Sequence, residues 1–316
     1  MKILITGATG FIGRHLLEDL ASGEHELHVL SRKESPVFSI PSEKLHIHRG
    51  DLSDRNSMIS ATKGIDVLIN TAAELKDHAR FEITNITGTE NILEAVKLNK
   101  VERVIHLSSV GVAGVQYAPA KRVVDESVKC EPKNEYERTK LISEQMFVKA
   151  FAGQSNLVVL RPTNVFGEAH PRQALLRYFS AIGNGKRIYG GTDAVFNYVY
   201  VKDLVSAMLF FLSKKNSSVI YNIGHPAAAK EMMEMSASAL KVKLNYSEIS
   251  SGLIRFPALF GYFGVSRIKS LSRTLTNRVE YSDELYRRES GGPYPYGLKI
   301  GIERTVNYYR TQGNLK

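Results

Sequence analysis

The sequence has very little cysteine and no long apolar run, and both absences narrow what the chain can be. Of its 316 residues only Cys130 is a cysteine, so no disulfide can form within the chain and a reducing compartment, the cytoplasm, is expected. The start, MKILITGATG, lacks a basic segment followed by a long apolar run, so no signal peptide is expected. No stretch of about 18 uninterrupted apolar residues occurs, which argues against a membrane span.

Long basic blocks are also absent, although the net charge is +10. A basic protein attracts anions such as nucleotides, nucleic acid or an acidic membrane surface. Lysine and arginine are interspersed with acidic residues here, so we expect no nucleic-acid partner. The sequence has no internal repeat, and its 43% hydrophobic content is typical of a globular protein with a sizeable core.

The first two-thirds of the sequence alternates between short apolar runs and helical patterns. Strands are predicted at 2–6, 26–31, 44–48, 66–72, 103–109 and 157–162, and helices at 11–22, 54–62, 81–98 and 136–152. Repeated strand–helix–strand units predict right-handed crossovers and a parallel sheet covered on both faces. The predicted fold class is therefore α/β, with a Rossmann-type doubly wound sheet.

The order loosens after about residue 165, which predicts a smaller C-terminal lobe. Helices are predicted at 172–183, from Asp203 and near 299–310, and strands at 194–201 and 219–224. We expect an NAD(P)-binding domain over 1–165, to which strands near 194–224 return, and a mainly substrate-binding lobe over 166–316.

One apolar stretch in this lobe has two interpretations. LIRFPALFGYF (253–263) precedes a basic segment at 267–278. It is either a segment packed into the core of the lobe, which we favour, or an interfacial segment that contacts acidic lipids.

A glycine-rich turn joins the first predicted strand to the first predicted helix. Gly7, Gly10 and Gly13 let the backbone turn tightly and approach a pyrophosphate, while the helix N-terminus presents N–H groups to the anion. The spacing is GxxGxxG rather than GxGxxG, and the strand before and the helix after supply the context that a nucleotide site requires. The predicted cofactor contacts of this turn are Gly7, Thr9, Gly10, Phe11, Ile12 and Gly13.

The end of the second predicted strand carries no acidic residue. An acidic residue there bonds the ribose hydroxyls of NAD, whereas a basic residue accommodates the 2′-phosphate of NADP. Ser31, Arg32 and Lys33 occupy this position, so NADP is favoured over NAD.

Two further segments complete the predicted cofactor site. Asp51 follows the third strand and is placed to bind the adenine amine, with Leu52 packing on the ring. Small residues end the fourth strand and allow close approach of the cofactor; they are Thr71, Ala72 and Ala73.

Tyr136 and Lys140 stand four residues apart on a predicted helix, and therefore on one face of it. A phenol is a poor base at neutral pH, but a nearby ammonium stabilises the phenolate. Such a pair can exchange a proton with an alcohol or a carbonyl while a hydride moves to or from nicotinamide. Ser108 and Ser109, at the end of the fifth strand, offer a hydroxyl that orients the substrate oxygen.

These segments, taken in order, resemble the extended short-chain dehydrogenase/reductases, the NAD(P)-dependent epimerase/dehydratase family. The segments are TGATGFIG, NTAAE, NITGTENILEA, HLSSVGVAG, YERTK, LRPTNVFG and NYVYVKDL, and they span residues 1 to about 225. The resemblance implies an NAD(P)-dependent enzyme, often dimeric through paired helices, for which the helix at 136–152 is available.

The resemblance also implies roles for individual residues. It makes Tyr136 the acid/base and Lys140 its partner, which also holds the nicotinamide ribose, and it favours Ser109 over Ser108 as the active-site hydroxyl. Asn85 resembles a family asparagine beside the active site, and Pro162 lies near the nicotinamide. The implied substrate contacts are Glu74, Ser109, Val110 and Asn164.

Two departures from the family pattern bear on the reaction. Val110 and Gly111 stand where family dehydratases carry an Asp-Glu pair, so dehydration is disfavoured. Phe196 stands where an arginine grips the diphosphate in sugar-nucleotide epimerases, which weakens that function. The charge could instead come from Arg267, Lys269, Arg273 and Arg278.

Several functions therefore remain open. A nucleotide-sugar epimerase or 4-ketoreductase is expected first. The alternatives are an NADPH-dependent reductase of a sterol- or flavonoid-like ketone, and a non-catalytic NADP(H)-binding sensor or assembly protein. No metal-binding residues are expected.

Overall fold

The computed structural model describes residues 1–33, 38, 40, 44–75, 77–171, 174–214, 216, 219–249 and 275–315. The apolar stretch at 253–263, and with it Arg267, Lys269 and Arg273, lies outside the described residues. No helix among the described residues is both long and apolar enough to cross a membrane.

A seven-stranded parallel sheet forms the centre of the molecule. Its strands, in spatial order, are β11 (Ile220–Ile223), β7 (Leu157–Pro162), β5 (Arg103–Leu107), β4 (Val67–Asn70), β1 (Lys2–Thr6), β2 (Glu26–Ser31) and β3 (Leu45–Arg49). The order reverses between β1 and β4, where the chain crosses from one half of the sheet to the other. The predicted α/β doubly wound fold is confirmed. The inner strands are buried because helices cover both faces of the sheet, whereas the edge strand β3 is partly exposed.

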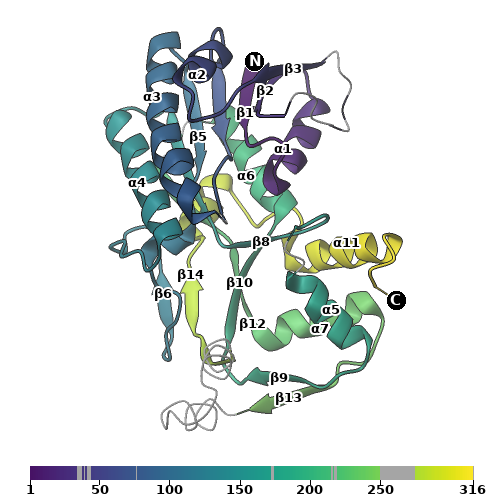
Figure 1. The fold of residues 1–316 in the computed structure, drawn as a ribbon. Helices are drawn as coiled ribbons and strands as arrows, with labels where there is room; N and C mark the ends of the chain where they lie inside the picture. The colour runs from purple at the N-terminus through teal and green to yellow at the C-terminus, as the bar shows by residue number, and fades with distance from the viewer. Residues whose placement is uncertain are drawn as a thin grey trace.

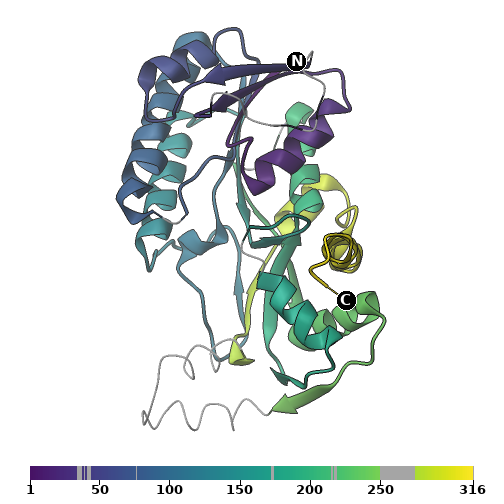
Figure 2. The ribbon, with the colours of Figure 1, turned by 45° about the vertical axis from the view of Figure 1, so that its right-hand side comes forward.

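Helices cover the two faces of the sheet from opposite sides (Figures 1 and 2). On one face lie α1 (Phe11–Ala21) and α6 (Val201–Ser213), whose Leu16, Leu17 and Val205 share a core cluster. On the other face lie α2 (Arg55–Ala61), α3 (Gly88–Asn99) and α4 (Glu135–Ala150). The predicted helix at 81–98 is in fact α3 preceded by a π-helical turn, η3 (Ile83–Thr87).

Among the residues that the structure describes, the rest of the chain builds three small sheets and four helices. The small sheets pair β8 (Asn164–Phe166) with β10 (Val195–Tyr200) and β12 (His225–Ala228), β9 (Ile188–Gly191) with β13 (Tyr246–Ile249), and β6 (Arg122–Val124) with β14 (Val279–Tyr281). The helices are α5 (Ala174–Gly183), α7 (Ala229–Leu240), α10 (Glu284–Ser290) and α11 (Gly297–Thr311). The small sheets and three of these helices lie at the carboxyl end of the large sheet, in the lower half of Figure 1, whereas α10 packs against β11 and α6.

Of the two late strands expected to return to the large sheet, only β11 does so, by pairing with β7. β10 pairs instead with β8 and β12. β8 follows β7 directly in the sequence but lies outside the large sheet, and β10 pairs with it there. The division into two domains near residue 165 stays a prediction.

Asp203, in the first turn of α6, fixes the start of α11. Its two carboxylate oxygens accept hydrogen bonds from the backbone N–H groups of Tyr296 and Gly297, both at 2.9 Å. Burial raises the pKa of Asp203 to about 6, so at neutral pH the carboxylate is still ionised. This contact places α11 against the small sheets, where Tyr309 reaches the cavity described below.

We predict that Asp203→Ala destabilises the protein by about 2–3 kcal/mol, because two N–H groups lose a charged acceptor in a buried setting. Thermal or urea unfolding measures the loss. Glu234→Ala, which removes an exposed carboxylate from α7, should change the stability by less than about 0.5 kcal/mol. Equal effects of the two substitutions would contradict the assignment.

Candidate active site

A cavity of about 820 Å³ opens at the carboxyl ends of the central strands. Thr6 ends β1, Ser31 ends β2, Asn70 ends β4 and Leu107 ends β5. The loops that leave these strands form its walls. In an open parallel sheet, this edge at the reversal of strand order is where ligands bind.

The glycine turn occupies the floor of the cavity between β1 and α1. Gly7 has a φ of +78°, and a Cβ there would lie 2.7 Å from the backbone nitrogen of Ala72. A Cβ on Gly13 would lie 2.2 Å from the carbonyl oxygen of Gly7. The folded chain itself therefore requires glycine at both positions.

Gly10 is different, because protein packing does not explain it. A Cβ at Gly10 would meet only the carbonyl oxygen of Gly7, at 3.1 Å, and otherwise projects into open space of the cavity. Gly10 is also the N-cap of α1; no side chain caps the helix, and no acidic residue stands in its first turn. The first N–H groups of α1 therefore face the cavity without a cap, and a side chain at Gly10 would narrow the space in front of them. Both features suit the binding of a cofactor phosphate.

The far end of the cavity is bounded by the ends of β2 and β3. Ser31, Arg32, Asp51 and Leu52 line it. The Arg32 guanidinium lies 3.9 Å from the Asp51 carboxylate, and its side chain is 62% exposed, so it stands at the mouth and can reach an anion there.

Lys33 and Val110 are the two predicted contact residues that do not line the cavity. The Lys33 N–H donates to the Ser31 hydroxyl at 3.1 Å, which turns the chain, and Lys33 is exposed. Val110 begins η4 (Val110–Ala113) and packs against a core cluster that contains Ala113 and Val115. The cavity geometry gives neither residue a contact role.

Tyr136 and Lys140 both line the cavity from the first turns of α4. Asn134 caps this helix by accepting from the Glu137 N–H at 2.9 Å, which fixes where the helix begins. Lys140 is 2% exposed, and its ammonium donates to the carbonyl oxygen of Leu107 at 2.6 Å. Burial lowers the pKa of Lys140 to about 8, against the opposing attraction of Glu144.

The two serines after β5 also line the cavity but differ in their bonding. Ser109 Oγ accepts from the Gly111 N–H at 3.1 Å and so caps η4, which leaves its O–H as a donor. The Ser108 hydroxyl is buried and has no hydrogen-bond partner among the described residues. Both hydroxyls are therefore available to a bound molecule.

Asn85 lies in the π-helical turn η3 and connects two walls of the site. Its Oδ1 accepts from the Glu74 N–H at 3.0 Å, and its amide donates to the Thr139 hydroxyl at 3.0 Å. The residue is 4% exposed and does not line the cavity. It fixes the loop after β4 relative to α4, and π-turns of this kind are frequent at functional sites.

A second set of buried polar contacts runs beneath the site. Thr6 donates to Asn70 at 2.6 Å, the Asn70 amide lies 3.0 Å from His106 Nδ1, and His106 Nε2 lies 3.4 Å from the Ser143 hydroxyl. Burial, and then repulsion from Lys140, hold the pKa of His106 well below its ordinary value, so the ring is neutral. These contacts tie β1, β4 and β5 to α4.

The remaining wall comes from elements whose role the sequence did not predict. Phe81, Leu175, Tyr198 and Tyr309 line it, from the segment before η3 and from α5, β10 and α11. Among the described lining residues, only Arg32 and Lys140 are lysine or arginine. Local sequence patterns do not predict this wall, because its residues are far apart in the sequence and come together only through tertiary packing.

Phe196, the residue in place of an expected arginine, does not line the cavity. Its ring lies 6.5 Å from that of Tyr178 and 6.1 Å from that of Tyr198, next to a separate small hollow. Arg278, the one described member of the basic set in the tail, pairs with Asp193.

The sheet, the glycine turn and the cavity at the strand ends define the class: a doubly wound nucleotide-binding α/β protein. Residues 3–224 match the NAD dependent epimerase/dehydratase family, and the chain belongs to this family. It is an enzyme of the extended short-chain dehydrogenase/reductase type, as the motifs predicted.

Relatives with different named activities match the chain. The N-acetyl-alpha-D-glucosaminyl-diphospho-ditrans,octacis-undecaprenol 4-epimerase of Escherichia coli O157:H7 is 26% identical, over 97% of this chain and 95% of its own. Sterol demethylase protein B of Methylococcus capsulatus is 28% identical, over 68% of this chain and 66% of its own. The solved UDP-glucose 4-epimerase of Thermotoga maritima is 21% identical, covers 99% of both chains and has a TM-score of 0.74.

We predict that Gly10→Ala leaves the fold intact and weakens binding of NADPH or NADH by at least about tenfold, because its methyl group enters the phosphate cradle. Cofactor fluorescence titration and a thermal melt measure the two effects. Gly13→Ala should instead lower the melting temperature, since its Cβ collides with the backbone. Unchanged cofactor affinity in Gly10→Ala would contradict the cradle.

Proposed function

We propose that the protein is an NAD(P)-dependent oxidoreductase or epimerase that moves a hydride to or from a carbinol carbon, with Tyr136 as the acid/base. The observation that carries the proposal is the convergence of Tyr136, Lys140 and Ser109 on one cavity that also contains the glycine cradle. A sugar carbinol is the favoured substrate, in a nucleotide-sugar epimerase or 4-ketoreductase. The undecaprenol-linked sugar epimerase among the relatives supports this choice.

Each residue has a distinct part in the proposed step. The Ser109 O–H donates a hydrogen bond to the substrate oxygen and orients it. Tyr136 donates its phenolic proton to that oxygen when a carbonyl is reduced, and the phenolate takes the proton back when an alcohol is oxidised. The Lys140 ammonium stabilises the phenolate. A bound nicotinamide would supply or accept the hydride.

Along the cavity, Gly7, Thr9, Gly10, Phe11, Ile12 and Gly13 would hold the cofactor phosphates. Asp51 and Leu52 would hold the adenine, and Thr71, Ala72, Ala73 and Pro162 would lie along the ribose and the nicotinamide. Glu74, Ser109 and Asn164 would contact the substrate.

Dehydration is not proposed. Val110 is apolar and packs against a core cluster, and Gly111 has no side chain, so neither offers an acid or a base. Glu135, the acidic neighbour of Tyr136 in the cavity wall, is hydrogen-bonded by Arg138 at 2.9 Å, which lowers its pKa and makes it a weak base.

A specific observation supports a second candidate, the NADPH-dependent reduction of a non-sugar ketone. The wall made by Phe81, Leu175, Tyr198 and Tyr309 is apolar and aromatic, which suits a sterol-like ring better than a diphosphate. The similarity to sterol demethylase protein B points the same way. Retained nucleotide distinguishes the candidates: an epimerase keeps NAD(H) through purification, whereas a reductase exchanges NADPH.

A homodimer and a cytoplasmic location remain part of the proposal. The exposed face of α4 is available for pairing with a second copy, and the single cysteine suits a reducing compartment.

We predict that Tyr136→Phe lowers turnover by about 10²–10⁴-fold and changes the cofactor affinity by less than about twofold, because only the proton is lost. A panel of UDP-hexoses, 4-keto sugars and sterol ketones, assayed for isomer formation and for NADPH oxidation, supplies the substrate. Tyr189→Phe, at an exposed tyrosine outside the cavity, is the control. If Tyr136→Phe keeps the turnover of the unaltered protein, the acid/base assignment is wrong.

We predict that Arg32→Ala weakens NADPH binding by about 10–100-fold and leaves NADH binding nearly unchanged, because the guanidinium would contact the 2′-phosphate. Lys33→Ala is the matched control: it also removes one exposed cation, but from outside the cavity. Paired fluorescence titrations give the affinity ratio. If Arg32→Ala leaves the ratio as it is, the preference for NADP is wrong.

A further inference from the structure

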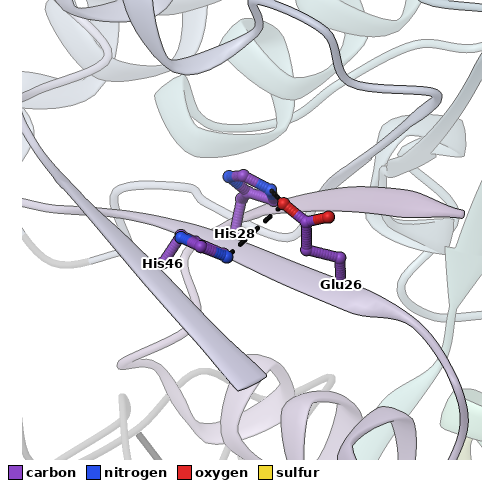
Figure 3. Close-up of side chains that lie close together, drawn as sticks. All are labelled: Glu26, His28 and His46. Carbon is purple, nitrogen blue, oxygen red and sulfur yellow. Dashed lines mark hydrogen bonds and ion pairs between the residues drawn. The ribbon is translucent and has the colours of Figure 1, made fainter. Parts of the chain in front are cut away.

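A cluster of three potential metal ligands lies on the outer strands of the large sheet. Glu26 and His28 stand two residues apart on β2 and therefore on one face, and His46 lies directly opposite His28 on β3. Figure 3 shows both imidazole rings turned toward the same carboxylate oxygen of Glu26. Their metal-binding atoms all lie within 4.8 Å of one another.

We propose that Glu26, His28 and His46 form a binding site for a divalent transition-metal ion, for which zinc is the best match. The Glu26 Oε1 atom lies 3.1 Å from His28 Nε2 and 3.4 Å from His46 Nε2. Ligand atoms bound to one tetrahedral zinc, at about 2.1 Å each, are separated by about 3.4 Å. The two distances to Glu26 therefore match a shared ion. The His28 and His46 rings stack with centroids 4.6 Å apart, so they would turn to direct both Nε2 atoms at it.

The donor set is also chemically suitable. Two imidazoles and one carboxylate are borderline ligands, which suit zinc and its neighbours in the first transition row and do not suit calcium or magnesium. The His46 side chain is 53% exposed, so the site opens to solvent and water can complete the coordination.

His48 forms a hydrogen bond with His28 that can fix the tautomer of the His28 ring. Its Nε2 lies 2.9 Å from Nδ1 of His28, on the side of the ring away from Glu26. When His28 Nδ1 carries the proton and donates to His48, the Nε2 atom of His28 has a free lone pair for a metal. Such a second partner, which fixes the tautomer of a ligating histidine, is the usual companion of a metal site.

Lys2 opposes metal binding. Its ammonium lies 3.5 Å from the same Glu26 oxygen. A bound divalent ion and this ammonium repel each other, so Lys2 must move away when the ion binds. Removing its charge should therefore strengthen metal binding, which gives a test that does not depend on losing a ligand.

The site would act on stability rather than on the proposed reaction. Glu26 begins β2 and Ser31, in the cavity wall, ends it, which places them about 16 Å apart at about 3.3 Å per residue. Among the described strands, β3 lies at the edge of the sheet, where it pairs with β2. A metal ion bound by His28 and His46 would join these two strands through their side chains.

The test uses the full chain without an affinity tag, because a histidine tag would bind the same ions. Isothermal titration with zinc, and the visible absorption of cobalt, should show one ion per chain. His46→Ala should weaken binding by at least about 100-fold, and His48→Ala by about 10-fold. His25→Ala is the control, because it removes the histidine next to Glu26 that is not part of the cluster. Less than one equivalent bound, or equal affinity in His46→Ala, would overturn the site.

Two further measurements test the site through Lys2 and through thermal stability. Lys2→Gln should bind zinc more tightly than the unaltered protein. Saturating zinc should raise the melting temperature of the unaltered protein and of His25→Ala, and should leave that of His46→Ala unchanged. Zinc that stabilises all variants equally, or a weaker Lys2→Gln, would contradict a site at Glu26, His28 and His46.

Discussion

The buried ammonium of Lys140 is the constraint on which the rest of the site depends. A cation with 2% exposure is costly unless its surroundings compensate for the lost water. Here the Leu107 carbonyl accepts from it at 2.6 Å, and Glu144, one turn further along α4, attracts it. Glu144 is in turn held by Arg161 of β7 at 2.9 Å, with both side chains almost fully buried.

The contacts of Lys140 and Glu144 also fix the position of α4 relative to the sheet. They hold α4 against the carboxyl ends of β5 and β7, so that Tyr136 faces the cavity from the first turn of the helix. Asn85 adds a second connection from the opposite wall through Thr139. A cavity that must hold a cofactor and a substrate together needs such fixed walls, because small displacements of an acid/base group reduce the rate sharply.

How much the sequence predicted depended on how local each feature is. The strands, the helices and the glycine turn were predictable, because hydrophobic periodicity and glycine spacing are read within about ten residues. Tyr136 and Lys140 were predictable as a pair, since four residues on a helix share a face. The small sheets were largely missed, because their strands are short and their partners lie far along the chain, as for β6 and β14.

The features that sequence could not supply are those that depend on register and tertiary packing. Tyr198 and Tyr309 come from β10 and α11 and share a cavity wall through tertiary packing, in which Asp203 fixes the start of α11. Glu26, His28 and His46 meet only because β2 and β3 pair in a register that sets His28 opposite His46. Lys33 shows the reverse case, since adjacency to Arg32 in sequence did not bring it into the cavity.

The central claim is that Lys140 stabilises the phenolate of Tyr136, and it can be measured without knowing the substrate. Tyrosinate absorbance, taken as the difference between the unaltered protein and Tyr136→Phe, follows the ionisation of this one side chain with pH. Burial lowers the pKa of Lys140 to about 8, but the phenolate and the ammonium stabilise each other, so the two groups titrate as a coupled pair. We predict that tyrosinate appears at a lower pH in the unaltered protein than in Lys140→Met, in which no ammonium is left to attract the phenolate. Identical titrations in the two proteins would contradict the account.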